Sequence, residues 1–375
     1  MRLLLTVGVV GVLAVCSGAL ASDGDAPFFS AINGTAAYAV SADGSVVVGV
    51  NHPPGTYAFR WEGGVMTLLG DLPGGGPGGG SRAYEVSADG SVVVGTGRPD
   101  SGFEAFRWTE DEGMVGLGDL PGGSMSSDAY GVSADGSVVV GTGSAAHNRE
   151  AFRWEDGVMT GLGDLPGGIA LSDGRAVSAD GSVVVGQANS ASGQEAFRWE
   201  NGVMTGLGGL SGEDFWSIAM DVSPDGSVIA GASNSALGME ACRWDDGEAT
   251  GIGDLPGGDF WSQAFALSGD GGVVVGMGTS ELGYEAFIWD EINGLRSVYA
   301  ALVNECGLNL DGWVLQLAFD VSYDGTTIVG SGINPNGIPE AWVAHMPEPT
   351  TGVLVALGAL LAARRRRREF NRPKL

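Results

Sequence analysis

Hydrophobic and polar positions repeat in one fixed order about every 45 residues along this chain. In the clearest copy, residues 83–87 alternate between small or apolar and polar, residues 91–95 are almost all Val or Gly, and residues 104–108 alternate again. Alternation predicts a half-buried strand, whereas a short apolar run predicts a strand buried on both faces. A fourth short segment, residues 114–120, completes the unit. Each copy therefore predicts a small four-stranded antiparallel sheet.

Two markers show that the unit occurs seven times. A period of this length is typical of stacked supersecondary units such as propeller blades. Packing the sheets face to face around an axis would bury the faces that each leaves open. We therefore expect an all-β fold over residues 36–346, a β-propeller of seven four-stranded blades. The serine that opens a Ser-x-Asp-Gly turn recurs at Ser41, Ser87, Ser133, Ser178, Ser223, Ser268 and Ser322. The tryptophan that ends the third segment recurs at Trp61, Trp108, Trp154, Trp199, Trp244, Trp289 and Trp342.

The last copy lacks the fourth segment. It ends near His345, and residues 28–33, just before the first copy, have the composition of a short strand. We expect the N-terminal segment 22–35 to supply this closing strand, so that the two ends of the chain join the ring.

The sixth copy is interrupted after Trp289. Apolar residues there are spaced as on one face of a helix, with Gly307 as a stop signal. We expect a short helix within residues 295–310, in place of the outer strand and between the sixth and seventh blades. Its stripe is either a packing face against those blades, which the sequence favours, or a partner site. The stripe comprises Leu295, Val298, Tyr299, Leu302 and Cys306.

The repeated motifs also carry a family resemblance. The order of a Ser-Pro-Asp-Gly-type turn, a Val-rich strand and a strand ending in Trp resembles WD-repeat blades, which implies that segments like 83–87 line the axis and segments like 114–120 form the rim. The combination of Ser-Ala-Asp-Gly-Ser-Val-Val-Val-Gly, Ala-Phe-Arg-Trp and Gly-Leu-Gly-Asp-Leu-Pro-Gly-Gly resembles the HAF family of bacterial extracellular repeats. This resemblance implies an exported protein and brings no catalytic residue with it.

The N-terminus reads as a secretory signal peptide over residues 1–21. Arg2 supplies the positive charge, residues 3–15 the apolar stretch, and residues 19–21 an A-x-A cleavage site. We expect cleavage between Ala21 and Ser22. A lipoprotein signal would use Cys16, but bulky Val15 stands where a small residue is expected.

Near the C-terminus, residues 347–368 have the pattern of a second sorting signal, and a short tail, residues 369–375, follows them. The apolar stretch 350–363 is shorter than the ~20 residues of a full membrane span, and the arginines after it would stay on the cytoplasmic side. An ordinary C-terminal anchor is one interpretation. The order of a Pro-Glu-Pro segment, an apolar stretch and an arginine cluster resembles the bacterial PEP-CTERM sorting signal. This resemblance implies processing by an exosortase and a cell-surface or extracellular location. The signal residues are Pro347, Glu348, Pro349, Arg364, Arg365, Arg366, Arg367 and Arg368.

Charge narrows the class of partner. Residues 22–346 contain 10 arginines, no lysine and 43 acidic residues, which gives a net charge of −33. Such a surface repels nucleic acid and anionic membranes. We therefore expect no nucleic-acid partner, and contact with a membrane only through the C-terminal segment.

The sequence contains no motif that assembles known chemistry. The three histidines, His52, His147 and His345, occupy no repeated position, and no Cys/His spacing fits zinc. No nucleophile elbow appears, and a phosphate-binding loop needs a lysine, whereas the one lysine is Lys374. The Gly-Leu-Gly-Asp segment at residues 161–164 recurs between blades and is turn architecture. We expect no catalytic, cofactor-binding or metal-binding residue.

Three polar features keep two interpretations each. The arginines of the Ala-Phe-Arg-Trp segment either pair with acidic neighbours between blades, which we favour, or bind a ligand. The turns after the tryptophan are acidic in the first six copies, as at residues 110–112. They would share a face with the Ser-x-Asp-Gly aspartates and form either a solvated surface, which we favour, or a Ca²⁺ site. Cys242 stands where other copies have Phe and is expected to be a buried hydrophobe; a disulfide with Cys306 stays open.

Two classes of function follow. The first is a non-catalytic surface or matrix protein, a rigid disc that binds extracellular polysaccharide or a surface protein. The alternative is a secreted propeller-type hydrolase or lyase that acts on an extracellular polymer. The sequence favours the first, because none of the acids in the loops stands out from the repeat.

Overall fold

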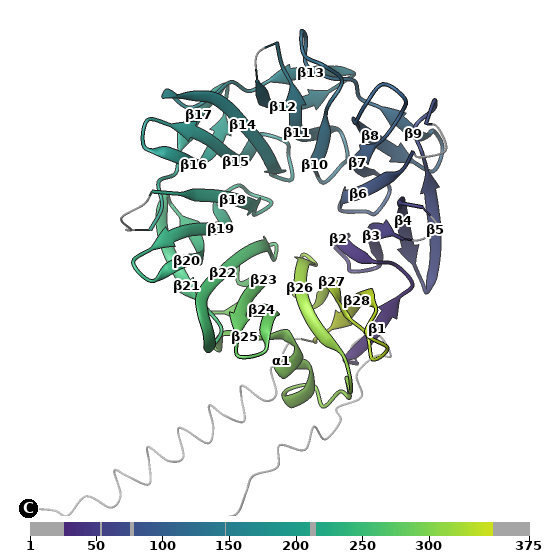
Figure 1. Cartoon of the computed structure of the whole chain (residues 1–375), viewed down its shortest axis with the longest axis vertical. Helices are drawn as coiled ribbons and strands as arrows, with labels where there is room; N and C mark the ends of the chain where they lie inside the picture. Colours follow the sequence, from purple (N-terminus) through teal and green to yellow (C-terminus); the bar gives the residue numbers. More distant parts are fainter. Residues whose placement is uncertain (1–25, 53–54, 76–78, 147, 211–214, 348–375) are drawn as a thin grey trace, which may run out of the picture.

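The computed structural model describes residues 26–52, 55–75, 79–146, 148–210 and 215–347. These residues form seven four-stranded antiparallel blades arranged around a central axis (Figure 1). The expected all-β propeller with one short helix is confirmed. The predicted signal peptide with its Ala21/Ser22 cleavage site and the sorting signal from Glu348 onward lie outside the described residues, and Pro347 is the last described position.

The two inner strands of each blade come from the first two segments of the repeat. The innermost strands of blades 1 to 7 are β2 (Ala36–Val40), β6 (Ser81–Val86), β10 (Asp128–Val132), β14 (Gly167–Val177), β18 (Ser217–Val222), β22 (Gly257–Leu267) and β26 (Val314–Val321). The second strands are β3 (Val46–Asn51), β7 (Val93–Gly97), β11 (Val138–Ser144), β15 (Val183–Ser190), β19 (Val228–Ser235), β23 (Val273–Ser280) and β27 (Thr327–Ile333).

The two outer strands come from the Trp-containing segment and the short segment after it. The third strands are β4 (Tyr57–Glu62), β8 (Glu104–Thr109), β12 (Arg149–Glu155), β16 (Gly193–Glu200), β20 (Gly238–Asp245), β24 (Gly283–Asp290) and β28 (Pro339–His345). The outermost strands are β5 (Val65–Gly70), β9 (Gly113–Gly116), β13 (Val158–Gly161), β17 (Val203–Gly206), β21 (Glu248–Gly253), β25 (Gly294–Ser297) and, in blade 7, β1 (Phe28–Ile32).

The hydrophobic core lies between neighbouring blades. In one cluster, Phe106 of blade 2 packs with Val46 and Val48 of blade 1. Phe106 is fully buried, whereas Trp108, two residues later on the same strand, is half-buried and packs against the edge of that cluster. A tryptophan repeated in every copy is expected to fill the space between sheets. In most blades that space is filled by the phenylalanine instead.

Each Ser-x-Asp-Gly segment is a turn that satisfies its own polar groups. In blade 2, Asp89 Oδ1 accepts hydrogen bonds from Ser87 Oγ at 2.8 Å, from Ser91 N at 3.0 Å and from Ser91 Oγ at 2.7 Å. Gly90 closes the turn with φ of 73°, a conformation that glycine adopts without strain. These donated bonds lower the pKa of the aspartates, to about 2 at Asp135.

The seven turns are joined by backbone hydrogen bonds around the axis. The residue after each turn serine donates its N–H to the carbonyl of the equivalent residue in the next blade, at 2.8–3.1 Å. Pro224 has no N–H, so the ring of bonds stays open at this one place. The members of this ring are Ala42, Ala88, Ala134, Ala179, Pro224, Gly269 and Tyr323.

A buried serine provides a second link between blades. Ser81, at the start of β6, accepts a hydrogen bond from Ala58 N of blade 1 at 3.0 Å and donates to the Gly70 carbonyl at 2.5 Å. The arrangement recurs in later blades. The equivalent residues are Ser127, Ser172, Ser217 and Ser262.

The N-terminal segment closes the ring, as expected. β1 pairs antiparallel with β28 from Phe28 opposite His345 to Ile32 opposite Ala341. Ile32 is buried and packs against Phe59 of blade 1. The first and last segments of the repeat array therefore share one blade (Figure 1).

The helix is shorter than the sequence predicted, and the outer strand that it was expected to replace is present. Helix α1 (Val298–Asn304) starts only after β25, in which Leu295 pairs with Trp289. The reason is Ser297, which pairs with Phe287 and then caps the helix by accepting a bond from Ala300 N. The apolar side of α1 packs on the sixth and seventh blades, so the packing interpretation is confirmed.

The closing strand gives a first test. We expect Ile32→Ala to lower the free energy of unfolding by about 2–5 kcal/mol, because it empties a packed site that connects two blades. Ala31→Ser, at the exposed neighbouring position, is the matched control and should leave stability nearly unchanged. Both are measured by thermal and denaturant unfolding of the purified protein. Equal stability of the two variants would contradict the closing role of β1.

Candidate functional site

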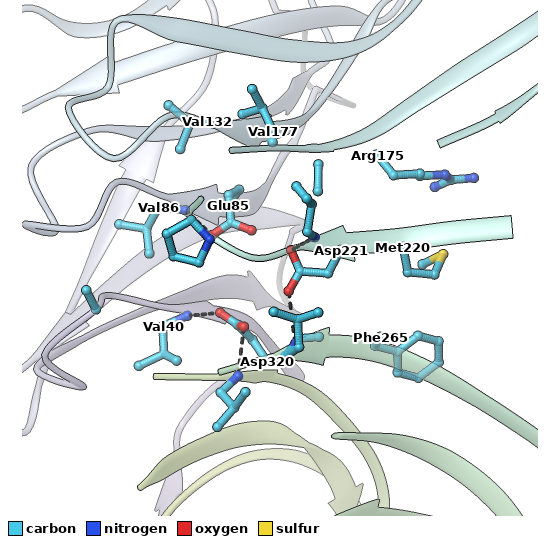
Figure 2. Close-up of a pocket in the computed structure, with 18 of the residues that line it drawn as sticks. Val40, Glu85, Val86, Val132, Arg175, Val177, Met220, Asp221, Phe265 and Asp320 are labelled. Carbon is cyan, nitrogen blue, oxygen red and sulfur yellow. Dashed lines mark hydrogen bonds between the residues drawn. The ribbon is translucent and has the colours of Figure 1, made fainter. Parts of the chain in front are cut away.

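The innermost strands enclose a cavity of about 490 Å³ on the propeller axis (Figure 2). Its walls come from equivalent positions of all seven blades, counted back from the turn serine. The position directly before the serine is Val or Leu in every blade. The next two positions carry the aromatic and charged side chains, and they give the cavity its chemistry.

The third position before the serine forms an aromatic collar. Tyr38 lies 5.0 Å from Phe319 and 5.7 Å from Tyr84 between ring centroids, Tyr84 lies 5.2 Å from Tyr130, and Phe265 lies 5.6 Å from Phe319. The Arg175 guanidinium continues the series, 4.8 Å from the centroid of the Tyr130 ring. The collar comprises Tyr38, Tyr84, Tyr130, Arg175, Met220, Phe265 and Phe319.

The second position before the serine forms an acidic layer. It is Ala or Gly in four blades, but it is Glu85 in blade 2, Asp221 in blade 5 and Asp320 in blade 7. All three side chains point into the cavity (Figure 2). These acids therefore come from distant parts of the chain and face one common space.

Backbone N–H groups hold the acidic layer in place. Asp320 accepts bonds from its neighbour Val321 N at 2.7 Å and from Val40 N of blade 1 at 2.8 Å. Asp221 likewise accepts from Val222 N at 2.7 Å and from Leu267 N of blade 6 at 2.9 Å. Two of the acids therefore also connect one blade to the next.

Glu85 is held less completely. Its Oε1 accepts a bond from Val86 N at 2.8 Å, and among the described residues no group donates to its Oε2. This oxygen is left facing the cavity.

A β-bulge in each inner strand explains why the collar and the acidic layer face the same space. The pairing register of β6 with β7 shifts between Ala83 and Glu85, so Tyr84 is the extra residue. The same shift occurs at the equivalent place in the other blades. An extra residue breaks the alternation of a strand and re-aims its side chains.

Burial raises the pKa of all three acids. Desolvation raises the pKa of Asp221 to about 6 and that of Asp320 to about 8, and the neighbouring Asp221 charge adds to the effect on Asp320. Desolvation and the nearby Asp320 raise the pKa of Glu85 well above its ordinary range. Like charges in a poorly solvated space disfavour the ionised form. At neutral pH the layer therefore holds protons that exposed acids would have lost.

The sequence analysis missed this layer. A signal for it was present: three copies carry an acid where the other four carry Ala or Gly, and such departures from a repeat mark residues that the fold alone does not require. The sequence analysis weighed only the acids of the loops, whereas these three lie on the inner strands.

The arginines of the Ala-Phe-Arg-Trp segment do bridge blades, but the bridging partner is a carbonyl. Arg60 Nε donates to the Gly90 carbonyl of the next blade at 3.1 Å, while its ion pair, at 2.7 Å, is with Glu62 two residues along its own strand. Arg107, Arg153 and Arg198 bond the equivalent carbonyls. The expectation of acidic partners between blades is corrected accordingly. An exposed ion pair contributes little, about 0–1 kcal/mol.

The other candidate groups lie apart from the cavity. His52 contacts Thr56, and His345 contacts Thr327 and stacks on Phe28; His147 lies outside the described residues. Cys242 is a free, fully buried thiol, so it forms no disulfide with Cys306, and burial raises its pKa. The Ser-x-Asp-Gly aspartates are bonded inside their turns. Among the described residues, no group of three or more His, Cys, Asp or Glu is placed to hold a metal ion.

The comparisons with known proteins support the fold. No protein-family model matches this chain, and no curated protein matches its sequence. An oligogalacturonate lyase from Vibrio parahaemolyticus is similar in structure, with a TM-score of 0.52, 10% identity and coverage of 86% of this chain and 98% of that one. A puromycin-hydrolysing peptidase from Mycobacterium tuberculosis is similar with a TM-score of 0.53 and 16% identity. The match covers 84% of this chain and 52% of the peptidase chain.

TolB from Acinetobacter baumannii gives a TM-score of 0.46 and 11% identity, with 81% of this chain and 64% of that chain covered. This chain thus spans less than two thirds of the TolB and peptidase chains. At these identities the likeness shows the propeller fold alone. Within the described residues, no helix is long and apolar enough to cross a membrane.

The acidic layer predicts a pH dependence. The folded state raises the pKa of Asp320 from 3.8 to about 8, so the stability that is fully present below about pH 4 is lost as pH rises to about 8. The melting temperature should therefore fall between about pH 4 and pH 8, and Asp320→Asn should weaken this dependence. Asp135→Asn is the control, because its pKa, lowered to about 2, lies outside the window. A dependence equal in all three proteins would contradict this assignment.

Proposed function

We propose that this protein is an exported, non-catalytic binding module that displays its propeller at the cell surface or in the extracellular matrix. The observation that carries the proposal is the axial cavity with its aromatic collar. Concave sites lined by aromatic side chains, with a few convergent polar groups, are the usual form of a small-ligand site. The ligand would be a small molecule or an exposed end group of an extracellular polysaccharide or surface protein.

The roles of the polar groups support binding over catalysis. Asp221 and Asp320 accept one backbone N–H bond on each oxygen, which holds their carboxyl groups in one position. Each oxygen keeps a further lone pair for a ligand, and a rigidly held acid suits a fixed binding surface. No histidine among the described residues lines the cavity.

The alternative is a propeller-type hydrolase or lyase that acts on an extracellular polymer. One observation favours it: Glu85 has one oxygen facing the cavity, and burial raises its pKa, the direction that a general acid requires. The similar structures include a lyase and a peptidase, at identities too low to carry an activity over.

The terminal segments support the proposed location. Residues 1–21 resemble a signal peptide, and Pro347, Glu348, Pro349 and Arg364 to Arg368 resemble a PEP-CTERM signal. An exosortase-type enzyme would process this segment, so that the C-terminus anchors the chain in the membrane only transiently. The strongly acidic propeller would then remain soluble outside the cell.

A binding screen tests the function. We expect the full chain, purified in a mild detergent, to bind one class of extracellular polysaccharide or surface protein without turnover. Tyr84→Ala, which opens the collar, should weaken that binding at least tenfold, while Val115→Ala on the exposed rim should not. Release of product from a polymer substrate by the wild-type chain, abolished by Glu85→Gln, would instead establish the enzymatic alternative.

Cell fractionation tests the location. In a host that has an exosortase, we expect the wild-type protein at the cell surface or in the medium, shortened at its C-terminus. Replacing Pro347, Glu348 and Pro349 by alanine should leave the C-terminus uncut and the protein in the membrane fraction. Identical processing of wild type and variant, followed by mass spectrometry, would contradict the sorting role of this segment.

A further inference from the structure

We propose that the axial cavity binds a protonated amine on an apolar stem, with the ammonium group at the layer of Glu85, Asp221 and Asp320 and the stem inside the aromatic collar. This inference rests on the proposed binding function and names the chemical class of its ligand.

The first support is the unpartnered oxygen of Glu85. Glu85 is half-buried, and its Oε2 faces the cavity without a hydrogen bond from the described residues, so it is open to a donor from a ligand. An ammonium group carries three N–H donors and a positive charge. It would supply the missing bond to Glu85 and offset the repulsion among the three acids.

The second support is the collar itself. The Arg175 guanidinium already lies over the Tyr130 ring at 4.8 Å, so one cation of the chain occupies a collar face. A cation over an aromatic ring is stabilised by the ring quadrupole, more so where water is excluded. Along each inner strand the collar position comes one residue before the position of the acidic layer, farther from the turn serine. A ligand with a charged tip and an apolar stem of a few carbons matches this order.

The charges of the lining favour a cation over other ligands. Strands β6, β18 and β26 carry the three acids, β14 carries Arg175, and β2, β6 and β10 carry tyrosines, while β22 contributes only apolar side chains. Three carboxyl groups face one guanidinium, which disfavours an anion. Among the described residues no group of three or more acids is placed to hold a metal ion, which favours an organic cation.

Binding should also release protons. Asp320, with its pKa raised to about 8, holds a proton at neutral pH, and an ammonium beside the three acids would lower their pKa values. The affinity should therefore rise with pH between about pH 6 and pH 8. A site that recognised only the apolar stem would show no such dependence.

Isothermal titration calorimetry of the full chain in a mild detergent tests the proposal. The probe is n-pentylammonium chloride, with 1-pentanol as its uncharged counterpart and sodium chloride at matched ionic strength. We expect saturable binding of one pentylammonium per chain and at least tenfold weaker binding of pentanol. Capped lysine, Nα-acetyl-lysine methylamide, is the second probe. Binding of capped lysine as well as pentylammonium indicates a lysine side chain of a partner as the source, whereas binding of pentylammonium alone indicates a free amine.

Two variants separate the charge from the collar. Glu85→Gln should weaken pentylammonium binding about tenfold and reduce the proton release, which is measured in buffers of different ionisation enthalpy. Glu110→Gln, which removes one charge from the exposed turn after β8, is the control and should bind like wild type. Tyr84→Leu should weaken the binding of pentylammonium as well. Each variant is first shown by its melting curve to be folded.

The outcomes are distinct. No saturable binding of pentylammonium, equal binding of pentanol, or unchanged binding by a folded Glu85→Gln variant would each overturn the proposal. If the screen described above finds a polysaccharide or protein ligand that pentylammonium does not displace, the proposed function stands and this inference fails. Displacement by pentylammonium supports both.

Discussion

Every blade of this propeller depends on contact with the next one, because a four-stranded sheet cannot bury both of its faces alone. The hydrophobic clusters therefore combine residues of neighbouring blades, as where Phe106 packs against Val46 and Val48. Hydrogen bonds follow the same rule: Ser81 connects blades 1 and 2, and Arg60 reaches the Gly90 carbonyl. Such links stabilise the array fully only when the ring is closed. The pairing of β1 with β28 is thus a condition for the stability of all seven blades.

The closed ring also creates the one space in which the blades can differ. Most repeated positions are fixed by packing or by turn geometry, as Gly90 and Asp89 are in their turn. Side chains that face the axis meet neither constraint, since they border a cavity. It is at these positions that the copies diverge: Glu85 stands where Ala39 stands in blade 1, and Arg175 where tyrosine stands in blade 2. Ligand recognition is expected where the repeat is broken.

This division explains what could be predicted from the sequence. The fold could, because the turns and the Val-rich strands are local patterns that recur seven times. The missing last segment also pointed to residues 28–33, of which residues 28–32 pair in the structure. The axial site could not be read in the same way. The bulge at Tyr84 breaks the alternation that places side chains in a simple strand, and Asp221 and Asp320 meet Glu85 only through the closure of the ring. The helix was overestimated for a related reason: an apolar spacing does not show that Leu295 pairs with Trp289.

The acidic character of the chain hides two different kinds of carboxyl group. Asp135 accepts bonds from Ser133 and Ser137 within its turn, which stabilises its ionised form and lowers its pKa to about 2. Asp320 also accepts two bonds, yet burial beside Asp221 raises its pKa to about 8. The turn aspartates already have the hydrogen-bond donors that stabilise their charge, so an added cation would gain little binding free energy there. The second kind lacks compensation for its charge. A cationic ligand gains most where the protein has left a charge unstabilised, and that place is the axis.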